Sequence, residues 1–180
     1  MVRLLLPLAA LAMTASVAAA PAPAGVSPTI FSFEQWVEDI IAHPDTALTV
    51  DEALAAAHAA DVVGSAGGLQ KRIRCDQESI GWPRAPGRDA AACVDDLARK
   101  GKNGVACTIG TNVFSIQMCR KGGARIVGSK SAASSQSANC NDVARTAGKV
   151  FDSCWRSDDT IVGSEICLTN NQMQINVLGV

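Results

Sequence analysis

The chain has 180 residues, which allows one domain with a processed leader, and 48% of them are hydrophobic. Seven acidic residues and no Lys or Arg lie between Pro21 and Gln70, whereas 13 basic and 10 acidic residues follow from Ile73 onward. The basic excess of the second part is small and interspersed with acids, which argues against a nucleic-acid-binding protein.

A secretory signal peptide is expected at residues 1–20. Arg3 precedes the apolar run 4–12, and small residues lead to a cleavage site near Ala20. The apolar run is shorter than the roughly 20 residues that a transmembrane helix needs, and no second such run follows. We therefore expect a secreted, extracellular protein without a transmembrane segment.

Residues 21–72 are expected to form an acidic helical pro-segment. Residues 31–42 are amphipathic, and Thr49 caps a second helix at 50–63. The segment ends in Lys71-Arg72, a dibasic pair after a Gly/Ser spacer, which is typical of a kexin-type processing site. The acidic helices would then shield an apolar surface of the mature domain, residues 73–180, until cleavage. The alternatives are simple surface charge for the pair and a disordered spacer for the segment.

The mature domain contains all seven cysteines, a density that indicates a disulfide framework made in an oxidising compartment. Helices are expected at 89–100 and 137–155, the second with Cys140 and Cys154 at the two ends of its buried stripe. Residues 129–137 are expected to form a loop. Strands are expected at 105–109, 113–119, 124–129, 160–168 and 172–178.

This order predicts an α+β fold, with two helices packed on one face of a four- to five-stranded antiparallel sheet. The fold would be stabilised by disulfides and preceded by the helical pro-segment. Alternation along 113–119 places Phe114, Ile116 and Met118 on one face, and alternation along 172–178 turns Met173, Ile175 and Val177 inward.

Seven cysteines allow three bridges and one spare thiol. Cys93 and Cys140 both lie on inner helical stripes, which favours a helix–helix bridge, and Cys75 on the opening extended segment is expected to meet Cys154. Strand alternation places Cys119 and Cys167 on the polar face, where they would pair and leave Cys107 as a buried free thiol. The alternative is a Cys107–Cys167 bridge with Cys119 free.

Catalytic chemistry is not expected. Both histidines, His43 and His58, lie in the pro-segment, and the mature domain has no His and no Tyr. This excludes Ser/His/Asp and Cys/His catalysis and His-containing metal sites in that domain. The acid pairs at 95–96 and 158–159 are interpreted as surface charge. We expect no enzyme activity, no catalytic residue, no metal and no cofactor.

Cations on turns and strand edges are the candidates for electrostatic docking to an acidic partner or a cell surface. Such residues also discourage edge-to-edge strand pairing, which is the commoner reason for their presence. They are Lys100, Lys102, Arg120, Lys121, Arg125 and Lys130.

The arrangement resembles fungal secreted effectors, which combine a signal peptide, an acidic pro-segment, a Lys-Arg site and a small cysteine-rich α+β domain. Residues 139–145 and 152–154, Gly163 and residues 170–173 are similar to the Ecp-type necrosis-inducing effector domain. A helix bridged at both ends over an antiparallel sheet also resembles the smut-fungus viral killer toxins. Those toxins carry a cysteine beyond the last strand, which is absent here.

The resemblance implies an effector-like protein, matured by a kexin-type protease, that acts outside the producing cell by binding a host or competitor protein or cell surface. The alternatives are an antimicrobial or killer-type toxin that acts on membranes or channels, and a hydrolase inhibitor. The resemblance implies no cofactor and no catalytic residue.

Overall fold

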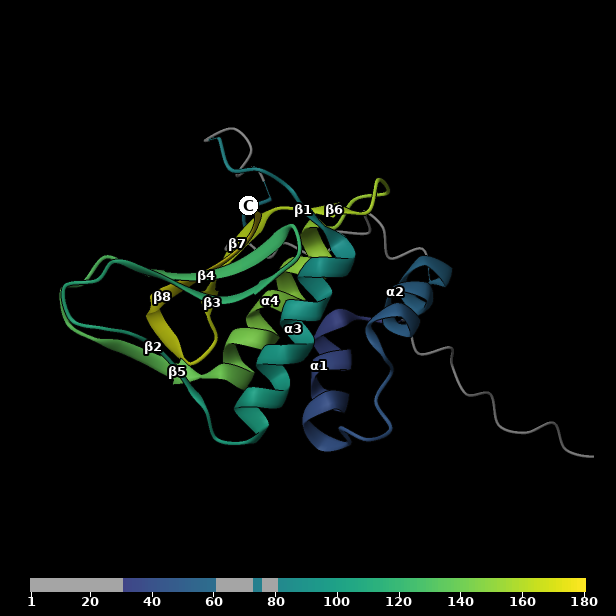
Figure 1. The fold of residues 1–180 in the computed structure, drawn as a ribbon, viewed down its shortest axis with the longest axis horizontal. Coiled ribbons are helices and arrows are strands. Elements are labelled where there is room, and N and C mark those ends of the chain that lie inside the picture. The colour runs from purple at the N-terminus through teal and green to yellow at the C-terminus, as the bar shows by residue number, and fades with distance from the viewer. Residues whose placement is uncertain (1–30, 61–72, 76–80) are drawn as a thin grey trace, which may run out of the picture.

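The protein is arranged in three layers, as a computed structural model shows for residues 31–60, 73–75 and 81–180 (Figure 1). A four-stranded antiparallel sheet forms one layer, helices α3 and α4 the second, and α1 lies on the far side of those helices. The signal peptide and the Lys71-Arg72 site lie outside the described residues.

Helices α3 (Gly87–Lys102) and α4 (Cys140–Cys154) run antiparallel and pack closely against each other. Gly87, at the start of α3, approaches the Trp155 side chain at the end of α4, and Gly101 abuts the start of α4 at Asn141. Asn139 caps α4 by accepting a hydrogen bond from the Asn141 N–H at 2.8 Å. The predicted helices are therefore present, and α3 extends two residues beyond each expected end.

The main sheet has the strand order β3-β4-β8-β7, and every neighbouring pair is antiparallel. Its long central strand β8 buries Met173, Ile175 and Val177, which confirms the predicted inward face. The fold class predicted from the pattern of elements is thus confirmed. The strands of this sheet are β3 (Ser115–Lys121), β4 (Ala124–Lys130), β7 (Gly163–Cys167) and β8 (Asn170–Gly179).

Two short ribbons lie beside the main sheet and differ from the predicted elements. β2 (Ala106–Ile109) pairs with β5 (Gln136–Asn139), so the predicted 129–137 loop ends in a strand and β2 does not join the main sheet. β1 (Ala85–Pro86) pairs with β6 (Thr160–Ile161), which divides the predicted 160–168 strand into β6 and β7.

A β-bulge in β3 changes the predicted facing of the second half of that strand. The register shifts between Gln117 and Cys119, so residues beyond the bulge turn to the opposite face. Cys119 is consequently buried opposite Ile126 and directed to the helical layer. Ile116, before the bulge and opposite the buried Gly128, lies on this same face as predicted, but it and Phe114 are 41% and 56% exposed at the start of the strand.

The disulfides are Cys75–Cys154, Cys93–Cys119 and Cys107–Cys140, and Cys167 is a buried free thiol. The first is the expected pair; the other two correct the sequence-based pairing. A Cys93–Cys140 bridge is wrong because Cys140 lies level with Gly101, eight residues or about 12 Å along α3 from Cys93.

The predicted Cys119–Cys167 bridge is wrong because β3 and β7 are the two opposite edges of the main sheet. Three strand spacings, about 14 Å, separate these edges. Cys107, expected to be free, instead meets Cys140 because β2 pairs with β5, the strand that leads directly into α4. The alternative Cys107–Cys167 bridge is wrong for the same reason.

Two helices precede the cysteine-rich domain: α1 (Phe33–Ala42) and α2 (Val50–Ala59). The expected Thr49 cap is confirmed as a capping box, in which Thr49 and Glu52 each satisfy a backbone N–H of the other. α1 packs on α4 and α3, α2 packs on α3, and the buried side chains of both helices belong to the same hydrophobic core as the rest of the protein.

Candidate functional site

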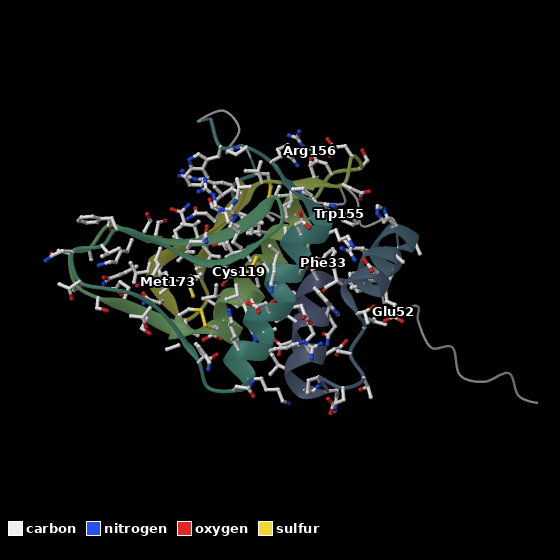
Figure 2. All side chains as sticks on the ribbon, in the orientation of Figure 1. Phe33, Glu52, Cys119, Trp155, Arg156 and Met173 are labelled. Atoms are coloured by element: carbon white, nitrogen blue, oxygen red, sulfur yellow. A yellow bond between two sulfur atoms is a disulfide. The ribbon has the colours of Figure 1, made fainter. Side chains whose placement is uncertain are left out.

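The candidate site is the surface of α3 and α4 that α1 covers, which we call the α3/α4 face. Its centre is aromatic: the Phe33 ring lies 4.4 Å from the Phe151 ring and 5.6 Å from that of Trp155, measured between centroids. Figure 2 shows Phe33 of α1 and Trp155 at the end of α4 close together. Phe33, Trp36, Val37 and Ile40, the apolar stripe of α1, are at most 1% exposed. The face therefore holds one complete side of an amphipathic helix.

Gly148 allows the backbones of α1 and α4 to come unusually close. A Cβ atom at this position would lie 3.1 Å from the Glu34 N and Cα atoms and from the Phe33 carbonyl carbon. Any larger side chain would press on the main chain of α1, which cannot move aside as a side chain can. This small residue fixes the depth at which α1 sits.

Asp152 binds the amino end of α1. Its Oδ1 accepts a hydrogen bond from the Phe33 N–H at 2.6 Å and its Oδ2 accepts one from the Glu34 N–H at 3.1 Å, while the Ser32 hydroxyl accepts from the Gln35 N–H. An acid in the last turn of α4 opposes the dipole of its own helix, but it complements the positive amino end of α1.

Burial raises the pKa of Asp152 to about 6, against the two N–H hydrogen bonds, which lower it. The nearby Glu34 carboxylate contributes to the increase. Burial against the end of α1 therefore makes the ionised form of the Asp152 carboxyl less stable than it would be in water.

Arg145 binds an acid in the middle of α1. Its Nε and Nη2 donate to the two carboxylate oxygens of Glu38 at 2.5 and 2.9 Å, and its Nη1 donates to Asp142 at 2.9 Å. The Arg145 guanidinium lowers the pKa of Glu38 by hydrogen bonding and charge, although burial opposes this. One turn further along α4, Lys149 lies 3.4 Å from Glu34.

Cations of α3 bind the carboxyl end of α1. Lys102 Nζ donates to the Ile41 carbonyl at 2.7 Å, and Arg99 donates to the Pro44 carbonyl at 3.1 Å. Positive charge at a helix carboxyl end stabilises the helix dipole. The face therefore contacts α1 at both ends, along its apolar side and at its central acid.

The second helix adds peripheral contacts. Arg88 at the start of α3 forms a two-bond ion pair with Asp51 at 2.8 and 3.0 Å. His58 lies 2.9 Å from Asp159, and its ring lies 4.6 Å from that of Trp155. These groups are exposed, so each pair contributes little to stability.

The cations singled out from the sequence do not form one docking patch. Lys100 and Lys121 both pair with Asp96, and Arg125 donates to the Gly179 carbonyl. Lys130 is buried and donates to the Ala133 and Ser134 carbonyls. Lys102 belongs to the α3/α4 face, and Arg120 lies exposed on the edge strand β3.

The site residues that sequence analysis missed are Asp152 and four cations, Arg88, Arg99, Arg145 and Lys149. The cations could have been anticipated. Their signal was present in the charge division, because an acidic segment without Lys or Arg needs cations elsewhere if it folds onto the same protein. Arg145 and Lys149 are also spaced i, i+4, which puts both on one side of α4.

Neither a metal site nor a membrane-spanning helix occurs in the part of the chain that the structure describes. There, no group of three or more His, Cys, Asp and Glu side chains is arranged to hold a metal ion. Within the same residues, none of the helices is both long and apolar enough to cross a bilayer.

Comparison with protein-family models matches residues 70–179 to a domain of unknown function, DUF8794. No curated protein and no solved structure gives a significant match. The matched residues begin beside Lys71-Arg72 and contain the three disulfides, but they leave out α1 and α2. Several disulfides in a small domain are consistent with an extracellular protein.

Proposed function

The chain belongs to the DUF8794 family, and from the position of its acidic helices we propose that it is a secreted binding protein whose α3/α4 face is uncovered by proteolysis after Arg72. In this proposal it is effector-like, and it acts outside the producing cell on a host or competitor target. The observation that carries the proposal is that the helix covering the face comes from the acidic segment that precedes the dibasic pair.

Contacts on the carboxyl side of the proposed cut support this order of events. The Arg74 N–H donates to the Ser164 carbonyl at 2.9 Å and its carbonyl accepts from the Ser164 N–H at 2.8 Å. Cys75 is bonded to Cys154. A new amino terminus at Ile73 would therefore stay attached to the domain, whereas residues 21–72 contain no cysteine and no disulfide would hold them.

Tethering of α1 explains why access to the α3/α4 face would depend on cleavage. A helix joined to its site by a short linker is present at an effective concentration near the millimolar range, and cutting the linker dilutes it to its own low concentration. Four buried apolar side chains contribute roughly 1.5–3 kcal/mol each, and association costs about 4–15 kcal/mol. The cut segment would then bind weakly enough to be replaced.

The test is expression of the secreted precursor with Lys71→Ala and Arg72→Ala together. Intact mass should show cleavage after Arg72 in the wild-type protein and none in the double variant, which should also fail to bind or damage host tissue on infiltration. Arg74→Ala is the matched control, because it removes a neighbouring exposed cation outside the pair. A double variant with full activity would contradict the proposal. Inhibition of competing microbes or leakage of vesicles by the cleaved form would favour the toxin alternative.

A further inference from the structure

We propose that the α3/α4 face recognises an acidic amphipathic helix of its partner, which takes the place of α1. This inference rests on the proposed function, because it names the partner of the same surface. The helix that covers the face, α1, serves as the template: it has ten residues, is about 15 Å long, and carries an apolar stripe with acids beside it.

The ends of the bound helix are recognised through its backbone and not through its sequence. Asp152 accepts from the first two N–H groups of α1, and Lys102 and Arg99 donate to carbonyls at and just beyond its last turn. Any helix of matching length offers these groups, since the terminal N–H and C=O groups of a helix have no partner within it. The face is therefore suited to helices in general and not to α1 alone.

Side-chain specificity comes from the middle of the face. Arg145 forms a two-bond contact with the Glu38 carboxylate, a geometry that selects a carboxylate at one position of the bound helix. Phe151 and Trp155 receive an aromatic ring about one and a half turns before this acid, where Phe33 now lies. The expected partner thus presents an aromatic residue followed five positions later by an acid.

The cations favour this partner over a lipid surface or a second copy of the chain. Arg145, Lys149, Arg99 and Lys102 already contact acids or carbonyls of α1 and of the residues just after it, and they would need equivalent partners once this segment leaves. The buried indole N–H of Trp155, which has no acceptor among the described residues, lies beside Gly87 at the start of α3.

The experiment uses the full chain with a site for a sequence-specific laboratory protease placed within residues 61–72. The protein is folded first and then cut, so the result does not depend on whether Lys71-Arg72 is the natural site. A fluorescein-labelled peptide of residues 31–60 is the probe, and fluorescence anisotropy measures its binding. We expect saturable binding to the cut protein and none to the uncut protein, whose tethered segment occupies the face.

A charge exchange distinguishes recognition from misfolding. The Glu38→Arg peptide should bind the cut protein at least about tenfold more weakly than the wild-type peptide, and an Arg145→Glu protein should reverse that preference. The Asp39→Arg peptide is the matched control, because Asp39 is exposed and lies off the face; it should bind as the wild-type peptide does.

Four results would overturn the proposal. The first two are equal binding of the peptide to cut and uncut protein, and no binding of the peptide to the cut protein. The third is equal affinity for the wild-type and Glu38→Arg peptides. The fourth is dimerisation of the cut protein, or its binding to phosphatidylglycerol vesicles, that the peptide does not inhibit. Failure of natural processing would instead contradict the proposed function and leave this measurement intact.

Discussion

The carboxylate of Asp152, in the last turn of α4, accepts a 2.6 Å hydrogen bond from the backbone N–H of Phe33, the first residue of α1. These residues are 119 positions apart. An acid at the end of one helix therefore acts as the cap of another, and this contact joins the acidic segment to the cysteine-rich domain.

Asp152 should make stability depend on pH. Burial raises its pKa from 3.8 to about 6, so between these values the folded protein binds more protons than the unfolded chain. The stability that Asp152 contributes is present below about pH 4 and is lost as the pH rises through 6. We compare the free energy of unfolding of the wild-type protein with that of an Asp152→Asn variant. The wild-type value minus the variant value should fall by up to about 3 kcal/mol between pH 4 and 7.

Urea unfolding of both proteins, followed by tryptophan fluorescence, measures this difference. Groups that titrate in the opposite direction, such as Glu38 with its lowered pKa, are present in both proteins and cancel. A difference that stays level or grows with pH would show that Asp152 does not lie in a buried contact with α1.

Phe33→Ala should lower the free energy of unfolding by about 3–5 kcal/mol, because it removes a fully buried ring that contacts Phe151 and Trp155. Phe114→Ala is the matched control: this ring is 56% exposed, and its loss should change stability by less than about 0.5 kcal/mol. Chemical denaturation measures both variants. Equal effects would mean that α1 does not pack on the α3/α4 face.

Gly148→Val should destabilise the protein by about 1–3 kcal/mol, because its side chain would press on the main chain at Phe33 and Glu34. Gly148→Ala should cost less, since the better helix propensity of Ala, about 1 kcal/mol, offsets part of the strain. Limited proteolysis should find α1 more accessible in the Val variant. A Val variant as resistant as wild type would contradict the close approach of α1 and α4.

Peptide mapping under non-reducing conditions should recover Cys75–Cys154, Cys93–Cys119 and Cys107–Cys140. Cys167, 2% exposed, should react with iodoacetamide only after the protein is denatured. Removing the Cys93–Cys119 bridge by double Ala substitution should cost about 2–4 kcal/mol. Recovery of Cys93–Cys140, or a thiol that reacts in the native protein, would contradict this arrangement.

Local pattern was enough to predict the helices and most strands. Apolar residues at three- and four-residue steps located α1, α3 and α4, and alternation located β8 with its inward face. The Thr49 cap could also be predicted from the sequence, because the two residues of its capping box are three positions apart. In each case the signal and the structure that it predicts lie in the same short stretch of chain.

Two of the three disulfide pairs, Cys93–Cys119 and Cys107–Cys140, could not be predicted in this way. The sheet face of each cysteine was inferred from the alternation of side chains along its strand. The bulge in β3 interrupts this alternation just before Cys119. The pairing of β2 with β5 likewise has no local signal, although it decides that Cys107 meets Cys140. These two pairs join residues 26 and 33 positions apart, and such contacts depend on how the whole chain packs.

The sequence by itself determined the division of charge, the helices of the acidic segment and the α+β class, because composition and periodicity are properties of neighbouring residues. Only the tertiary structure decided where the acidic helices lie and which cations receive them. Arg145, Lys149 and Asp152 look like ordinary surface residues of one helix until α1 is packed against them. Their role arises from two helix surfaces meeting, which no single stretch of chain encodes.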